Sequence, residues 1–73
     1  MTIKEGRYYL DGMGVVRGPM IMTPNPALPF RCPRSFDLYE SSGRSGIHPL
    51  SDYDLTTECD KDGNLINNKP KKQ

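Results

Sequence analysis

The side chains that could carry acid–base chemistry are seven carboxylates and one histidine, spread along a chain of 73 residues. They are Asp11, Asp37, Glu40, His48, Asp52, Asp54, Glu58 and Asp60. A catalytic pair needs two such groups converging in a water-excluding cleft with shifted pKa values. A chain this short has little depth for such a cleft, and it holds neither a nucleophile-elbow serine motif nor a glycine-rich phosphate loop with a lysine. The sequence therefore predicts a protein that is not an enzyme.

Metal binding and disulfide formation are the other chemistries to consider. A structural zinc site needs four ligands, whereas Cys32, Cys59 and His48 are the only soft candidates and no Cys-x-x-Cys pair is present. Because nothing in the sequence indicates secretion, we expect both cysteines to remain free thiols. We predict no metal and no cofactor.

Binding chemistry has more support in the residue pattern. Residues 26–31 fit Pro-x-x-Pro-x-Arg, a ligand pattern read by aromatic-lined grooves, with a packed loop as the alternative interpretation. Aliphatic residues are few, so most of the six aromatic side chains must enter the core. Any that stay exposed beside an arginine would form a platform for a base or a protein partner. The residues predicted to bind a partner are Tyr9, Arg17, Phe30, Arg31 and Arg34.

Short strands must position these residues. Residues 3–17 predict a β-hairpin with its turn at residues 11–14, and with Tyr8 and Leu10 on the face opposite Tyr9. Residues 20–22 could continue the second strand past Pro19 if they lie at a sheet edge or a bulge. Four prolines in ten residues then predict a long loop over 23–34 without strand pairing.

The second half of the chain continues this pattern. We expect a strand over 35–39 with Phe36 and Leu38 on one face, a flexible turn over 41–46, and a short strand at 47–48. A strand over 51–58 should place Tyr53, Leu55 and Thr57 on one face. A turn at 60–64 and a weak return pairing of residues 65–66 precede a polar, disordered tail. No segment shows a helical period over ten residues, so helices are at most one turn long.

These elements predict an all-β protein, a small antiparallel meander in the form of an SH3-like half-open barrel with a disordered C-terminal tail. Residues 1–59 form the domain, with the proline-rich loop at 23–34, and residues 60–73 form a turn and a flexible basic tail. Residues 1–60 carry six basic and eight acidic side chains, whereas residues 61–73 carry four lysines and one aspartate. A weakly acidic body argues against a duplex-binding face. The absence of a long apolar run predicts a cytoplasmic protein without membrane contact.

Several short motifs occur in a fixed order. They are Gly6-Arg7-Tyr8-Tyr9, Gly14-Val15-Val16-Arg17-Gly18-Pro19-Met20, Pro29-Phe30, Leu38-Tyr39, and Asp54-Leu55 with Glu58. Over residues 3–58 this order resembles a group of small uncharacterised bacteriophage proteins, which typically open Gly-Lys-Tyr-Tyr, carry Gly-Pro-Met or Gly-Pro-Leu, and close Asp-Leu-Val-x-Glu. The chain departs from that group with Phe30 in place of a common Trp and Thr56 in place of Val. The resemblance implies a phage or prophage origin and a small β domain, and it implies no catalytic residues.

Together these features predict a non-enzymatic phage accessory protein that binds a host or phage protein, with inhibition of a host defence or regulatory component as one mode. The contact surface is expected in the 23–34 loop and the exposed tyrosines of the first hairpin. Two alternatives stay open: a β-barrel that binds a nucleotide or single-stranded nucleic acid through exposed aromatics, and a minor virion component. An unpaired edge strand would favour a homodimer.

Overall fold

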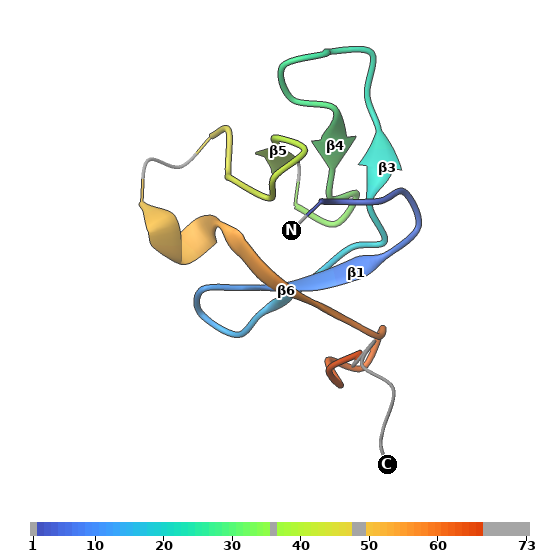
Figure 1. Ribbon diagram of the computed structural model, residues 1–73, viewed down its shortest axis with the longest axis vertical. Coiled ribbons are helices and arrows are strands. Elements are labelled where there is room, and N and C mark those ends of the chain that lie inside the picture. Colours follow the sequence, from blue (N-terminus) through green and yellow to red (C-terminus); the bar gives the residue numbers. More distant parts are fainter. Residues whose placement is uncertain (1, 36, 48–49, 67–73) are drawn as a thin grey trace.

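Short β-strands and a single 3₁₀ turn make up the described part of the fold (Figure 1). The computed structural model describes residues 2–35, 37–47 and 50–66. The elements are β1 (Tyr8–Asp11), β2 (Val16–Arg17), β3 (Ile21–Met22), β4 (Phe30–Arg31), β5 (Leu38–Tyr39), the 3₁₀ turn η1 (Ser51–Tyr53) and β6 (Leu55–Cys59). The expectation of an all-β protein is confirmed. The expectations for Phe36, for His48 and for a disordered tail after Ile66 lie outside the described residues.

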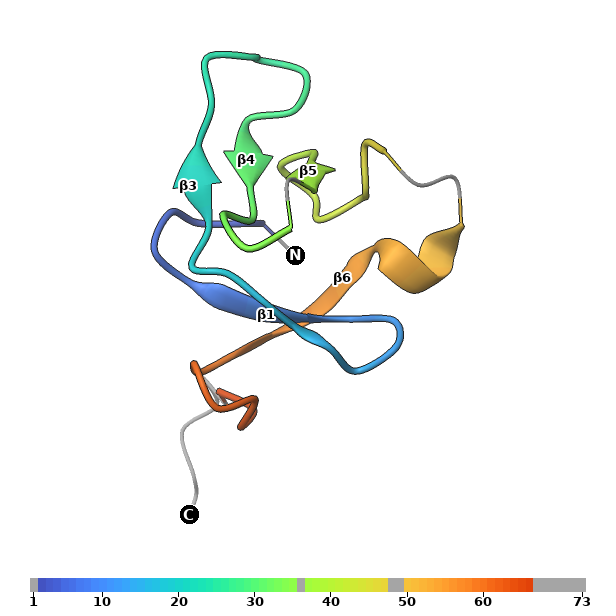
Figure 2. The same cartoon turned by 180° about the vertical axis from the view of Figure 1, so that it is seen from behind.

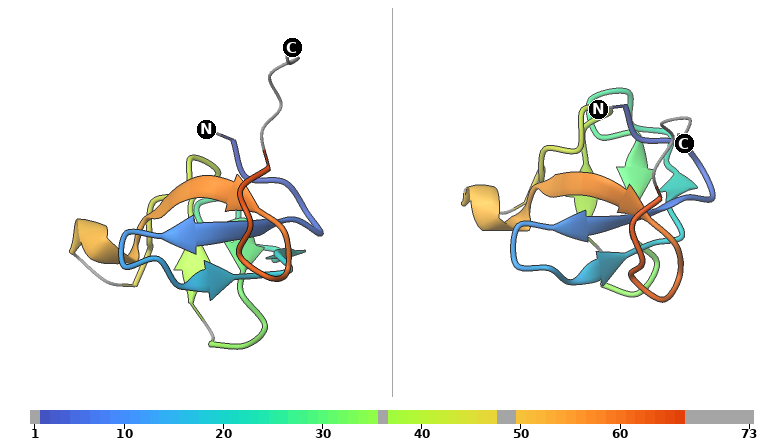
Figure 3. Two further views of the ribbon diagram at one scale, coloured as in Figure 1. Left: turned by 90° about the horizontal axis from the view of Figure 1, so that it is seen from below. Right: turned by 60° about the horizontal axis from the view of Figure 1, so that its bottom comes forward.

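The first sheet has the strand order β2-β1-β6. β1 and β2 form the expected antiparallel hairpin, in which Tyr9 lies opposite Arg17. On its other side β1 pairs with β6, where Tyr9 lies opposite Glu58. Figure 3 shows these three strands side by side, with the second sheet behind them. The order departs from a plain meander, because the first strand lies between the second and the last.

The chain passes from the first sheet to the second at Gly18, between β2 and β3. Gly18 has a φ of +137°, and a Cβ built there would lie 2.8 Å from the Arg7 carbonyl oxygen. Only glycine fits so close a backbone approach at this φ. Met20 then exchanges backbone hydrogen bonds with Gly6 and Arg7. Met20 thus continues the pairing beside the first strand past an interruption at residues 18–19, as expected, and Ile21–Met22 then form β3 at the edge of the second sheet.

The second sheet has the order β3-β4-β5, so β4 is its central strand. Phe30 on β4 lies opposite Met22 on one side and Tyr39 on the other. The prediction that residues 23–34 form no strand pairing is therefore wrong for Phe30–Arg31. These two residues lie between prolines but keep their own amide hydrogens, which is what a central strand requires.

After β5 the chain turns back beside that strand before it reaches η1 and β6 (Figure 2). The Glu40 amide donates to the Arg44 carbonyl at 2.8 Å, and the Gly46 amide donates to the Leu38 carbonyl at 2.8 Å. The segment that turns back beside β5 makes its last such hydrogen bond at Gly46. Ile47 lies in no strand, so the predicted strand at 47–48 is wrong for this residue.

β6 is shorter than predicted, and its pairing with β1 is interrupted. Leu10 lies opposite Thr57, but the next residue, Asp11, lies opposite Leu55, so the register skips one residue of β6. Such a bulge breaks the two-residue alternation of a strand. Leu55 consequently enters the core while Thr57 is half-buried on the Leu10 face. The prediction that Tyr53, Leu55 and Thr57 share one face is wrong for this reason.

The core lies between the two sheets. Its members are Ile3, Tyr9, Met20, Phe30, Cys32, Tyr39 and Leu55. Tyr8 and Leu10 lie on the face of β1 opposite Tyr9, as predicted, and the structure shows that the Tyr9 face is the one that enters the core. Both cysteines are free, as expected, and Cys59 is buried outside this cluster, where Leu65 bridges back to it.

Candidate functional site

The five residues predicted to bind a partner do not share one surface. Tyr9 is 1% and Phe30 is 8% exposed, and both belong to the core. The expectation that these two rings contact a partner is corrected, because a chain with few aliphatic side chains must use its aromatics to fill the core. Arg31 is half-buried, and within the set Arg34 alone is exposed.

Arg17 joins two buried carboxylates instead of facing solvent. Its Nε donates to Oδ2 of Asp11 at 3.1 Å, and its Nη1 lies 3.6 Å from Oδ2 of Asp37. Asp11 belongs to the first sheet, and Asp37 directly precedes β5 in the second. Oδ1 of Asp11 also accepts hydrogen bonds from the amides of Met13 and Val15 in the hairpin turn. Arg17 therefore ties the two sheets together.

The electrostatics of this cluster follow from its burial. Burial opposes the charge of Arg17, but the hydrogen bond to Asp11 and the neighbouring negative charges outweigh it and raise the pKa of the guanidinium. Burial, assisted by the charge of Asp37, also raises the pKa of the Tyr39 phenol. These groups hold the fold together, and Arg17 is not available to a partner.

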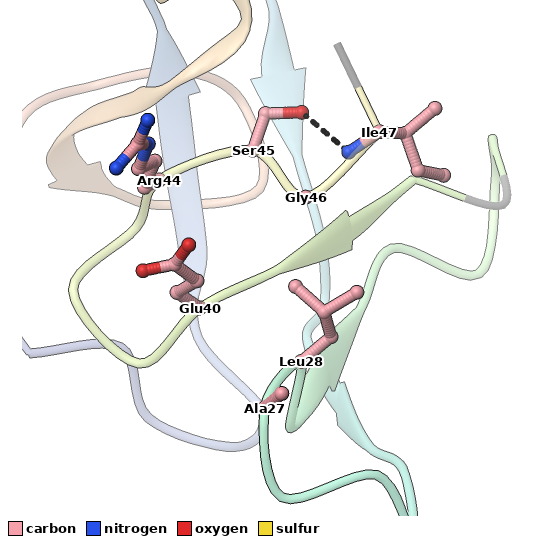
Figure 4. Close-up of a pocket in the computed structure, with 7 residues that line it drawn as sticks. All are labelled: Ala27, Leu28, Glu40, Arg44, Ser45, Gly46 and Ile47. Atoms are coloured by element: carbon pink, nitrogen blue, oxygen red, sulfur yellow. Dashed lines mark hydrogen bonds between the residues drawn. The ribbon is translucent and has the colours of Figure 1, made fainter. Parts of the chain in front are cut away.

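An open groove of about 630 Å³ lies between the β3–β4 loop and the segment that follows β5 (Figure 4). Its lining consists of Ala27, Leu28, Glu40, Arg44, Ser45, Gly46 and Ile47. Ligand sites in proteins commonly have volumes of about 300–1,000 Å³. Sequence reasoning placed the contact surface in the 23–34 loop, which includes Ala27 and Leu28, but it named Glu40 only as an acid–base candidate and none of the seven as a partner-binding residue.

The loop that presents Leu28 is held by its own polar groups. The Ala27 amide donates to Oδ1 of Asn25 at 2.9 Å, and the Thr23 hydroxyl donates to the Leu28 carbonyl at 2.7 Å. The Leu28 amide donates to the Asn25 carbonyl at 3.2 Å. Three prolines restrict the same loop further. The last two residues of the Pro-x-x-Pro-x-Arg pattern form β4, while Pro26 and Ala27 are exposed.

Hydrogen bonds also hold the opposite wall of the groove, formed by the segment that follows β5, in place. The Ser45 amide donates to Oδ1 of Asp54 at 2.9 Å, and the Ile47 amide donates to the Ser45 hydroxyl oxygen at 3.4 Å. Gly46 lies directly against Leu28, so that a Cβ at this position would overlap the leucine methyl groups. The missing side chain at Gly46 is what allows Leu28 to form the apolar part of the groove.

Glu40 and Arg44 supply the charge. Neither forms an ion pair with a described residue. Glu40 is half-buried, Arg44 is exposed, and the hydroxyl-bearing Ser45 is 7% exposed. A carboxylate, a guanidinium and a serine hydroxyl supply hydrogen-bond donors and acceptors of both charges to a bound ligand.

Comparisons with protein-family models, with curated proteins and with solved structures gave no match. Among residues 2–35, 37–47 and 50–66, no three His, Cys, Asp or Glu side chains gather in a way that could hold a metal ion. The same residues contain no helix with the length and apolar character needed to cross a membrane. The candidate site is therefore defined by the groove and its lining.

Proposed function

We propose that the protein is a non-enzymatic binding module that takes a segment of another protein into the groove beside Leu28 and Ile47. The observation that carries this proposal is a groove with an apolar part and two charges that pair with no described residue, built on walls that hydrogen bonds already hold in place. A preformed site loses less conformational entropy on binding than a loop that must first be ordered. The resemblance to small phage proteins favours a host or phage protein as the target, and the host cytoplasm as the place of action. Inhibition of a host component is one consequence.

The finer fold that we propose is the SH3-like half-open barrel. Two features support it: the chain crosses directly from β2 in one sheet to β3 in the other, and the first strand pairs with the last. β-Barrels often bind ligands at their mouths, between loops carried by a rigid framework.

Nucleic-acid binding has weaker support. A stacking platform requires exposed aromatic rings, but Tyr9, Phe30 and Tyr39 lie in the core, and Tyr8 and Tyr53 are half-buried. We therefore treat nucleic acid as an alternative outcome of the test.

Capture from a bacterial host lysate tests the proposal. Ile47 is 50% exposed, so Ile47→Asp should leave the core intact while placing a charge in the apolar part of the groove. We expect this variant to retain the captured protein about tenfold less well than the wild type, as loss of a central apolar contact does at other interfaces. Mass spectrometry of the eluates gives the comparison.

The matched control is Leu65→Asp, because Leu65 is 64% exposed and lies outside the groove. It should capture the same protein as the wild type. Equal capture by the Ile47→Asp variant would overturn the assignment of the groove. Recovery of nucleic acid without a protein partner would favour the alternative function.

A further inference from the structure

We infer that the segment bound in the groove carries an aliphatic side chain directly beside a single lysine or arginine. This inference rests on the proposed function and specifies the chemistry of the partner.

The apolar residues of the groove are the reason to expect an aliphatic side chain in the bound segment. Leu28 and Ile47 approach the groove from its two walls, and Gly46 between them adds no side chain (Figure 4). Leu28 is half-buried and Ile47 is half exposed, so a ligand methyl group would remove apolar surface of both from water.

The Glu40 carboxylate is the reason to expect a lysine or arginine next to that aliphatic side chain in the bound segment. Glu40 lines the same groove as Leu28 and Ile47, so a residue next to a bound aliphatic side chain would face the Glu40 carboxylate (Figure 4). Glu40 is partly removed from water, and no described cation pairs with it. A cation supplied by the ligand would give this carboxylate the partner that the chain itself does not provide. The excess of acidic over basic side chains in residues 1–60 also favours approach of a cation.

Arg44 limits how basic the segment can be. It is exposed and extends away from Leu28 at the rim of the groove (Figure 4). A second basic residue near this rim would meet a like charge, which disfavours a lysine- or arginine-rich run. The site therefore selects one basic residue beside an aliphatic one, not a polybasic tail.

Titration with three capped peptides, followed by amide resonances in nuclear magnetic resonance, tests the inference on the full chain. The probes are glycine–serine peptides that carry one leucine followed by lysine, glutamine or glutamate. We expect all shifts to centre on the amides of Leu28, Gly46 and Ile47. The lysine peptide should bind about two- to fivefold more tightly than the glutamine peptide, the usual gain from a partly exposed ion pair, and the glutamate peptide should bind least.

Two substitutions separate the contributions. Glu40→Gln should abolish the preference for lysine while leaving the glutamine peptide bound as before, and Glu5→Gln, at an exposed carboxylate outside the groove, should change neither. Gly46→Ala should displace the Leu28 side chain and weaken all three peptides. Dispersed amide spectra establish that each variant is folded.

The outcomes are distinct. Equal affinity for the lysine and glutamine peptides, with shifts still centred on the groove, would refute the inference and leave the proposed function standing. Shifts at these amides on simple concentration of the protein would mean that a second copy occupies the groove, which also contradicts the inference. If no peptide shifts them but a short single-stranded oligonucleotide does, both the inference and the protein-binding function fail.

Discussion

The charged side chains of this protein fall into two groups. Some hold the two sheets together from a buried position, and others lie on the surface. Arg17, with its side chain 17% exposed, lies between Asp11 and Asp37, whereas Arg7, 51% exposed, pairs with Glu58 at 2.6 Å on the surface. The two arginines look equivalent in the sequence, because each follows or precedes a short apolar run of the same hairpin. Their difference arises from Asp37, a carboxylate 20 positions further along the chain than Arg17 that only the packing of the two sheets brings near.

Replacement of Arg17 by methionine should therefore destabilise the protein strongly. The variant leaves the buried Asp11 carboxylate without its cation and removes the contact between Arg17 and Asp37. Removal of one partner from a buried charge pair typically costs about 3–5 kcal/mol. Arg7→Met removes an exposed pair, which is usually worth less than about 1 kcal/mol. The free energies of unfolding in urea provide the comparison. A similar loss in both variants would show that Arg17 does not bridge the sheets.

At the scale of elements, the structure depends on where a strand changes sheet. β2 and β3 are separated by three residues, 18–20, yet they belong to different sheets. The prolines and glycines of this region predicted an interruption, but they did not predict that the strand would cross to the other sheet. Turns were more predictable. The expected turn at 60–64 is confirmed, with Oδ1 of Asp60 accepting the amide hydrogens of Asp62 and Asn64. The backbone amide of Asn64 is the main cause that lowers the pKa of the Asp60 carboxyl.

Gly18→Ala and Gly14→Ala separate backbone strain from steric overlap at the crossing. Both glycines have positive φ, +137° and +80°, so alanine is strained at either position. A Cβ at Gly14 has no neighbour within 4 Å, whereas one at Gly18 meets the Arg7 carbonyl and Tyr8. We expect Gly14→Ala to cost about 1–2 kcal/mol of stability, from strain alone. Gly18→Ala should cost more or prevent folding, and urea midpoints provide the test. Equal midpoints would contradict the close approach at Gly18.

For the whole molecule, the core combines apolar packing with titratable groups that must stay neutral. Burial is the main cause that raises the pKa values of Tyr9 and Tyr39, and of the Cys59 thiol. Because an unfolded cysteine ionises near about pH 8.5 and an unfolded tyrosine near about pH 10, the unfolded chain releases these protons before the folded protein does. The contribution of each group to stability is thus complete below its own unfolded pKa and declines as the pH rises above that value. The sheets also leave β2 and β3 at their edges, and the homodimer through edge pairing stays a prediction.

The Tyr39→Phe variant should consequently resist alkali better than the wild type. Above about pH 10 each tyrosine with a raised pKa contributes a decline of up to about 1.4 kcal/mol per pH unit. The variant should show a shallower decline in the free energy of unfolding. The slope is compared, so a uniform change in stability from the lost hydroxyl does not matter. Tyr8→Phe, outside the core cluster, is the control; a wild-type slope in the Tyr39→Phe variant would contradict the prediction.

The sequence by itself determined the local features: the all-β class, the first hairpin with its alternating faces and the turn at 60–64. These depend on a two-residue period and on turn residues, which act between near neighbours. The tertiary structure decided which aromatics enter the core, which arginine is buried, and that Leu28, Glu40 and Ile47 line one groove. Such outcomes depend on the crossing at Gly18 and on the register skip in β6, which bring together segments far apart in the chain. A local pattern does not encode these contacts, because each requires both sheets to be in place.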